Sequence, residues 1–303
     1  MKWLAKKWLI GIGAIFLILI VWLTFRETPV AIETETIKRG ELTVTIDGEG
    51  KTRIHDRFVV TAPVSGRMAR IRLHEGDSVA KDFVVTAIDP NPPARPLAPS
   101  QNERFSDIYG IKVYAPVAGK VLRILAKDEQ MISAGTPILE IGNPENLEIV
   151  IDVLSNEATR IKPGARILIE NWGGPAPLHA RVRTVEPQAF TKVSTLGVEE
   201  QRVNIIADLA DKSIRLGDNY RIEAKIITWQ AENILKVPSS ALFRQGEKWN
   251  VFVVENGKAR LREVGIDHQN NSETEVIKGV GEGETVILHP SNQIADGVKV
   301  SVQ

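Results

Sequence analysis

The 303-residue sequence has no cysteine, few aromatic residues and no excess of charge of either sign. The absence of cysteine excludes disulfide bonds, thiolate metal sites and cysteine nucleophiles. The 38 basic residues balance the 38 acidic residues, so the net charge gives no basis for nucleic-acid binding, which needs a basic face. A chain of this length is expected to form two or three compact units, and its 23 glycines and 16 prolines are typical of a turn-rich β protein.

The longest uncharged apolar stretch runs from Trp8 to Phe25. Its 18 residues would extend about 27 Å as a helix, close to the roughly 30 Å hydrocarbon core of a bilayer. Three lysines precede it, which predicts a cytoplasmic N-terminus with the bulk of the chain outside the inner membrane. The alternative is a cleaved signal peptide, which the absence of a small-residue cleavage site after Phe25 disfavours.

An internal repeat follows. Residues 62–89 align without a gap with residues 115–142 at an offset of 53, with seven identities and the shared start Ala-Pro-Val-x-Gly. Each copy reads as short strands separated by turns and is too small to bury a face alone. We predict that the two copies pack together as one small β sandwich. The turn glycines Gly66 and Gly119 are expected to have positive φ.

The duplicated half and the turn Glu75-Gly76-Asp77 resemble the lipoyl/biotinyl-type domain of HlyD-like periplasmic adaptors, the membrane fusion proteins. In true lipoyl or biotin carriers a tight turn between the halves bears the modified lysine. Here residues 90–114 replace that turn, and the nearest lysine, Lys112, is expected to be an ordinary exposed side chain.

In this family an α-helical hairpin usually lies between the two halves. Residues 90–100 of this chain contain five prolines, which break helices. The hairpin is therefore expected to be missing and replaced by an extended link of polyproline type. This departure puts direct docking to an outer-membrane channel in doubt.

A small β-barrel is predicted after the repeat, with a brief helix at Ser155–Ile161. Within it, Phe190–Asn204 resembles a segment that recurs in one branch of the adaptor family. Glu199 and Glu200 in that segment are expected to lie in a solvated turn. The strand segments are Leu147–Val153, Ala165–Asn171, Leu178–Val185, Gln201–Leu209 and Tyr220–Trp229.

The C-terminal residues resemble the membrane-proximal domain of adaptors. Asn256-Gly257 lies between two apolar runs and predicts a β-hairpin. In the family this domain also takes strands from the residues just after the anchor, and Glu33–Ile46 fits that role because its Ile and Val positions alternate.

The expected fold class is therefore mainly β: an N-terminal transmembrane helix, a split lipoyl/biotinyl-like β sandwich, a small β-barrel with one short helix, and a membrane-proximal β domain. The expected divisions are 1–26 for the cytoplasmic N-terminus and transmembrane anchor, 27–54 for strands that pair with the membrane-proximal and barrel domains, 55–89 for the first lipoyl-like half, 90–114 for the proline-rich link, 115–144 for the second half, 145–232 for the barrel and 233–303 for the membrane-proximal domain.

The sequence contains no motif typical of a catalytic, cofactor-binding or metal-binding site. The glycine-rich stretch Gly279–Gly283 precedes a strand rather than a helix, so it is expected to be a turn and not a phosphate loop. Glu282 and Glu284 in and beside this turn are not expected to form a desolvated catalytic pair. We predict no catalytic, cofactor-binding or metal-binding residue, and no enzyme. The histidines are scattered without metal-ligand spacing: His55, His74, His179, His268 and His289.

The resemblance implies a periplasmic adaptor subunit that scaffolds a multi-component export pump. Its implied partners are an inner-membrane transporter, either proton-driven or ATP-driven, further copies of itself in a ring or dimer, and an outer-membrane channel. One alternative is a degenerate adaptor that binds only the inner-membrane transporter. The other is a lipoyl or biotin carrier subunit of an enzyme complex, which the missing lysine turn opposes.

Overall fold

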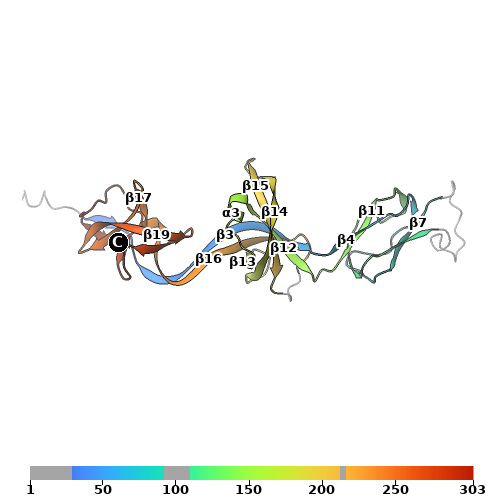
Figure 1. Ribbon diagram of the computed structural model, residues 1–303, viewed down its shortest axis with the longest axis horizontal. Helices are drawn as coiled ribbons and strands as arrows, with labels where there is room; N and C mark the ends of the chain where they lie inside the picture. The colour runs from blue at the N-terminus through green and yellow to red at the C-terminus, as the bar shows by residue number, and fades with distance from the viewer. Residues whose placement is uncertain (1–28, 92–109, 212–215, 303) are drawn as a thin grey trace, which may run out of the picture. The chain divides into compact units, whose positions relative to one another are not determined.

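The computed structural model describes residues 29–91, 110–211 and 216–302, which are mainly β-strand (Figure 1). They form two compact units. The larger contains residues 45–228, and the smaller contains the described residues up to Val44 together with those from Trp229 onward. Within the described ranges, no helix has both the length and the apolar character needed to cross a membrane. The predicted anchor and most of the proline-rich link lie outside the described residues.

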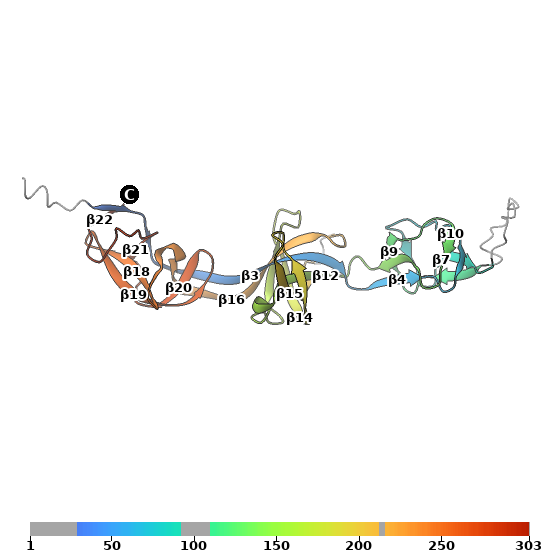
Figure 2. The same cartoon turned by 90° about the horizontal axis from the view of Figure 1, so that it is seen from above.

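The two repeat copies fold together as one β sandwich within the larger unit, as predicted. β7 (Val84–Asp89) and β11 (Pro137–Gly142) are related by the same offset of 53 as the sequence copies. One sheet has the strand order β10-β5-β7-β8 and the other has the order β4-β11-β9-β6. Figure 2 labels β7 and β10 of the first sheet and β4 and β9 of the second. The other strands are β4 (Arg57–Thr61), β5 (Gly66–Met68), β6 (Ser78–Val79), β8 (Ile111–Tyr114), β9 (Gly119–Ile124) and β10 (Gln130–Ile132).

The copies exchange strands. β10 belongs to the second copy but pairs with β5 of the first, while β6 of the first copy pairs with β9 of the second. The sandwich core is likewise shared, with Ile71 and Ile88 from the first copy packed among Ile138, Leu139 and Ile141 from the second. Burying one such side chain contributes about 1.5–3 kcal/mol, so neither copy retains its core without the other.

The barrel is closed. Its strands follow the order β13-β14-β15-β12-β3-β16, and β16 pairs with β13 to complete the circle. Alternate isoleucines such as Ile149, Ile151 and Ile167 point inward and are fully buried. The strands are β3 (Lys38–Ile54), β12 (Leu147–Leu154), β13 (Arg166–Glu170), β14 (Leu178–Val193), β15 (Glu199–Leu209) and β16 (Arg221–Pro238).

Two local expectations for the barrel need correction. The predicted helix is present but short, because α3 covers only Ser155–Ala158. The expectation that Glu199 and Glu200 lie in a turn is wrong, since both belong to β15. The turn lies before them, where the backbone N–H of Ser194 donates to the carbonyl of Val198 at 2.8 Å.

The smaller unit brings the two ends of the described chain together. β1 pairs with β22 in parallel, and β2 pairs with β21. Asn256 and Gly257 have φ values of 52° and 72° and join β18 to β19, which confirms the predicted hairpin. The strands are β1 (Val30–Ile32), β2 (Thr34–Thr36), β17 (Phe243–Gln245), β18 (Lys248–Glu255), β19 (Lys258–Gln269), β20 (Glu273–Lys278), β21 (Thr285–Ile287) and β22 (Val300–Val302); the 3-10 turn η1 covers Ser239–Ala241.

Gly66 and Gly119 do not have the positive φ that the sequence analysis expected, so that expectation was wrong. Glycine is needed there because another strand passes too close. A Cβ atom at Gly66 would lie 2.1 Å from the carbonyl oxygen of Asp89, and one at Gly119 would lie 2.8 Å from that of Gly142. Backbone atoms cannot move aside as a flexible side chain can.

We expect Gly66→Ala to destabilise the larger unit by about 2 kcal/mol or more, because the added methyl group overpacks a strand contact. The matched control is Gly76→Ala, where φ is +94° but no atom lies within 4 Å of the added Cβ. That control should cost only about 1 kcal/mol of backbone strain. Thermal unfolding of both variants measures the difference, and equal melting temperatures would contradict the steric explanation.

Candidate functional site

A row of charged side chains crosses the barrel strands at the end where the chain leaves the barrel for the sandwich. Strand pairing sets Arg53 of β3 opposite Glu148 of β12, and Glu148 opposite Asp208 of β15. Directly paired residues share one face of a sheet, so these three side chains are neighbours. Glu148 lies in the middle and is only 3% exposed.

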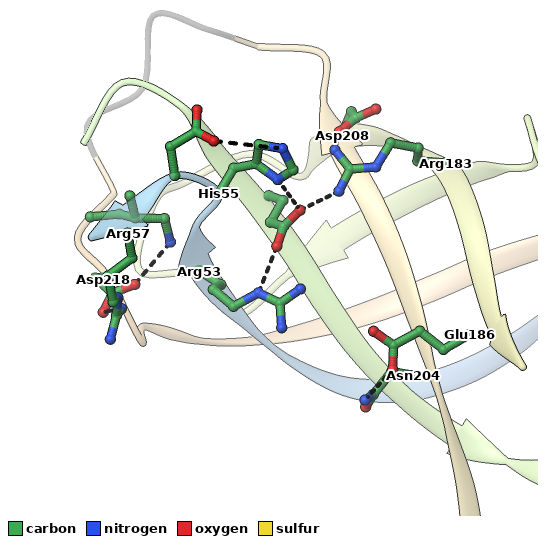
Figure 3. A network of polar contacts seen from close by, with 11 residues as sticks. Arg53, His55, Arg57, Arg183, Glu186, Asn204, Asp208 and Asp218 are labelled. Carbon is green, nitrogen blue, oxygen red and sulfur yellow. Dashed lines mark hydrogen bonds and ion pairs between the residues drawn. The ribbon is translucent and has the colours of Figure 1, made fainter. Parts of the chain in front are cut away.

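Three basic side chains, Arg53, His55 and Arg183, bond to the Glu148 carboxylate; all three are labelled in Figure 3. Arg53 Nε donates to Oε1 at 2.6 Å, His55 Nδ1 lies 2.8 Å from Oε2, and Arg183 Nη2 also donates to Oε2. Burial alone would raise the pKa of Glu148, but the hydrogen bonds from His55, Arg53 and Arg183 outweigh it and hold the pKa below its ordinary value. Glu148 is therefore a buried anion that keeps three basic groups in place.

Arg57, the first residue of β4, links the sandwich to the barrel. Its guanidinium donates to Glu140 of β11 at 3.3 Å and to Asp218 in the loop before β16. Asp218 also accepts the backbone N–H of Ile54 at 3.0 Å. One arginine thus connects a strand of the sandwich to a barrel loop that is itself bonded to the end of β3.

The returning connection between the two domains is bonded to the outgoing one. Asn146 Nδ2 donates to Asp56 Oδ2 at 2.9 Å, and the Asn146 carbonyl accepts the His55 backbone N–H at 2.9 Å. The connection from β3 to β4 and the connection from β11 to β12, which we call the two chain crossings, are therefore held side by side. We call the following set the ionic latch: Arg53, His55, Arg57, Glu148, Arg183 and Asp218.

The latch residues lie beside an open cleft of about 1320 Å³ between the barrel and the sandwich. The latch contains no hydroxyl or thiol nucleophile. Each of its carboxylates is engaged by an arginine, which leaves Glu148 and Asp218 unsuited to act as general bases. The arrangement can fix two β domains against each other, and the sequence analysis did not single out any of it except His55.

Within the described part of the chain, one group brings three metal-ligand side chains together: Asp267, His268 and Glu275, whose ligand atoms lie within 4.8 Å of one another. His268 Nδ1 lies 2.9 Å from Glu275 Oε2, and its ring stacks on Trp229 with the ring centroids 3.7 Å apart. The histidine is thus held by a hydrogen bond and a ring stack. The sequence analysis did not predict this group, because Glu275 lies on β20 whereas Asp267 and His268 lie on β19.

The glycine-rich stretch before β21 is a turn, as predicted. Gly279 and Gly283 have φ values of 103° and 87°. Glu284 accepts the Gly281 backbone N–H at 2.7 Å and Arg262 Nη1 at 2.6 Å. Burial would raise the pKa of Glu284, but these hydrogen bonds outweigh it and the pKa is lowered. Glu284 is therefore an ionised side chain that stabilises the turn.

Two parts of the chain match known domain families. Residues 56–141 match the barrel-sandwich hybrid domain of the RND membrane fusion proteins, and residues 234–302 match the C-terminal permuted SH3-like domain of YknX. The chain belongs to the membrane fusion protein family of periplasmic adaptors. The first match covers the strand-exchanged sandwich, and the second covers β17–β22.

Individual relatives of this membrane fusion protein are distant in sequence. YknX of Bacillus subtilis (strain 168) is 23% identical over 172 residues, which are 54% of this chain and 44% of the relative. The macrolide export protein MacA of Escherichia coli O157:H7 is 24% identical over 183 residues, which are 58% of this chain and 48% of the relative. The chain thus spans about half the length of the curated relatives it matches.

The fold is shared with a solved member of the family. The crystal structure of MacA from Actinobacillus actinomycetemcomitans superposes with a TM-score of 0.64 at 18% identity, covering 85% of this chain and 99% of that one. Membrane fusion proteins are adaptors and not enzymes. Lys112 lies within β8, opposite Ala87 of β7, and not at the tip of a tight turn. This position does not suit a carrier lysine.

We expect Glu148→Gln to lower the free energy of unfolding by about 1–3 kcal/mol at pH 7, because Arg53 and Arg183 lose their counter-charge. The folded-state pKa of Glu148 is lowered. Its contribution is therefore present above the unfolded-state pKa of about 4.3 and is lost as the pH falls through the folded-state value. Urea unfolding at neutral and acidic pH measures both effects.

The control for this prediction is Glu145→Gln, an exposed residue whose side chain forms no ion pair with the described residues. It should leave stability unchanged at both pH values. If Glu148→Gln lowers the free energy of unfolding as much below pH 4 as at pH 7, the loss comes from the changed side-chain geometry and not from the lost charge.

Proposed function

We propose that this chain is the periplasmic adaptor subunit of a bacterial export pump. It works as a scaffold that couples an inner-membrane transporter, driven by protons or by ATP, to the exit path. It associates with further copies of itself in a ring or dimer around the transporter. The observation that supports this most directly is the strand-exchanged sandwich followed by a closed barrel, in a chain with the family's domains at residues 56–141 and 234–302.

The ionic latch adds a physical reason for a coupling role. An adaptor that transmits movement needs its domains joined by contacts that resist bending. Arg57 bonds a strand of the sandwich to a barrel loop, and the Glu148 cluster holds together the barrel strands from which both chain crossings start. In the proposed pump, a displacement of the barrel is carried into the sandwich through these bonds.

The location follows from the first residues. We propose that residues 1–26 anchor the chain in the inner membrane with the N-terminus in the cytoplasm and the rest in the periplasm. The proposed divisions after the anchor are those of the sequence analysis, with the barrel at 145–232 and the membrane-proximal domain at 233–303. One relative is named a macrolide export protein, which makes macrolides the first cargo to test.

A second candidate is an adaptor that binds only the inner-membrane transporter. β7 ends at Asp89 and β8 begins at Ile111. A hairpin of two three-turn helices needs about 22 residues before any loop is added. The proline-rich stretch therefore leaves too little chain for the hairpin that family members direct toward an outer-membrane channel.

The test is crosslinking in intact membranes, followed by affinity capture of the full chain and mass spectrometry. We expect a polytopic inner-membrane transporter to be recovered with the full chain. A variant lacking residues 1–26 but exported by a cleavable signal should move to the soluble periplasmic fraction and recover less transporter.

The outcomes separate the proposals. Failure to recover any transporter with the full chain would contradict the adaptor function. An outer-membrane channel crosslinked through residues 90–114 would contradict the inner-membrane-only candidate and leave the adaptor function in place. A truncated variant that stays in the membrane fraction would contradict the anchor.

A further inference from the structure

The β14–β15 hairpin extends beyond the barrel strands that flank it. β15 pairs with β12 only as far as Arg202 opposite Leu154, whereas β14 and β15 continue to pair with each other up to Val193 opposite Glu199. Figure 1 shows the yellow hairpin projecting from the barrel at the label β15. We call residues 191–201 the finger.

Charged contacts fix the direction of the finger at its root. Lys192 Nζ lies 2.9 Å from Asp152 Oδ2 on β12 and 3.6 Å from Glu49 Oε2 on β3. Arg202 donates to Asp152 and to Glu200, the latter at 2.8 Å. A two-stranded hairpin is marginally stable alone, so these ion pairs hold it as a projection from the barrel.

The tip of the finger exposes three apolar side chains. Leu196 is 90% exposed, Val193 is 61% exposed and Val198 is 58% exposed. The neighbouring Glu199 is exposed and has no ion pair with any residue the structure describes. Apolar side chains beside an uncompensated acid suit a partner surface that is itself apolar and basic.

The cleft beside the latch has the opposite character. Three basic residues that line it, Lys51, Lys120 and Arg123, have no ion pair within the described ranges. The β9–β11 register shifts at Leu122, so Lys120 and Arg123 face outward together although they are three residues apart. Leu122 and Pro144 add apolar surface to the same cleft.

The acidic residues of the cleft are already bonded. Glu140 and Asp218 pair with Arg57, and Glu148 pairs with Arg53 and Arg183. Glu75 accepts the Ile124 backbone N–H at 3.2 Å, and Glu186 accepts Asn204 Nδ2 at 2.8 Å. Among the basic residues that line the cleft, the three cations Lys51, Lys120 and Arg123 are the ones without an ion pair to any described residue.

We propose that the finger of one copy of the chain inserts into the cleft of a second copy. Glu199 meets Lys120 and Arg123, and the exposed Leu196 packs against Leu122 and Pro144. The cleft volume of about 1320 Å³ exceeds the roughly 300–1,000 Å³ of small-molecule sites, so it has room for a hairpin tip. This contact deepens the self-association in the proposed function and rests on it.

The proposed contact joins two different surfaces of the same chain. Such a heterologous interface repeats from copy to copy and closes as a ring when the rotation between copies allows. Finger and cleft both lie within residues 45–228. Each copy therefore offers one finger and one cleft from a single compact unit.

Because the chain has no cysteine, single cysteines can be introduced without background. Full-length Leu196→Cys and Lys120→Cys chains with different tags are mixed in detergent and oxidised mildly. We expect a mixed disulfide dimer of the two tags. The matched control pairs Leu196→Cys with Met131→Cys, another exposed sandwich residue at 66% exposure outside the cleft.

Charge reversal gives the second measurement. Glu199→Lys and Arg123→Glu should each weaken the affinity of self-association about five- to tenfold at low salt. The double variant, in which the two charges are exchanged, should recover most of that affinity. The effect should shrink at high salt, where exposed charges are screened. Glu247→Lys, an exposed acid on the smaller unit, should change nothing.

The outcomes distinguish the contact from the wider function. A wild-type chain that self-associates, with no mixed dimer above the Met131→Cys control and no rescue by the double charge reversal, overturns the finger–cleft contact and leaves self-association standing. A wild-type chain that stays monomeric in detergent and in membranes overturns both. Disulfides that form only between two Leu196→Cys chains would show a tip-to-tip contact and overturn the proposal.

Discussion

The exchange of strands between the two repeat copies is the constraint on which the sandwich depends. β6 and β10 each complete the sheet of the other copy, and the buried side chains of the two copies form one cluster. Within the first copy, β5 and β7 pass so close that Gly66 leaves no space for a Cβ beside Asp89. Loop-closure entropy grows only slowly with length, so the link between the copies can vary in length at little cost to the sandwich.

The second constraint is the buried charge of Glu148. An isolated carboxylate in this position would cost several kcal/mol, and three hydrogen bonds from basic side chains offset that cost. Arg53, His55 and Arg183 are thereby held in one arrangement by one anion. A buried ion cluster adds little net stability compared with apolar packing, but removing one of its partners is costly because it leaves an uncompensated buried charge.

Local patterns in the sequence were enough to predict much of the fold. The offset between the repeat copies reappears in the positions of β7 and β11, and Asn256-Gly257 forms the expected hairpin. The length of the finger was missed, because β14 was expected to end at Val185 and runs to Val193. Beyond Val185 neither face of the strand is buried, so the alternation that marks a strand is weak there.

The sequence by itself determined what depends on neighbours along the chain: the alternation of apolar residues, the turns, and the equivalence of the two copies. Only the tertiary structure decided which remote groups meet. Glu148 lies 95 residues from Arg53 and 35 from Arg183 along the chain, and no local pattern relates them. The same holds for Gly66, which faces the backbone of Asp89, and for the cleft cations that have no ion pair with the described residues. Their roles are set by distances that exist only once the strands have paired.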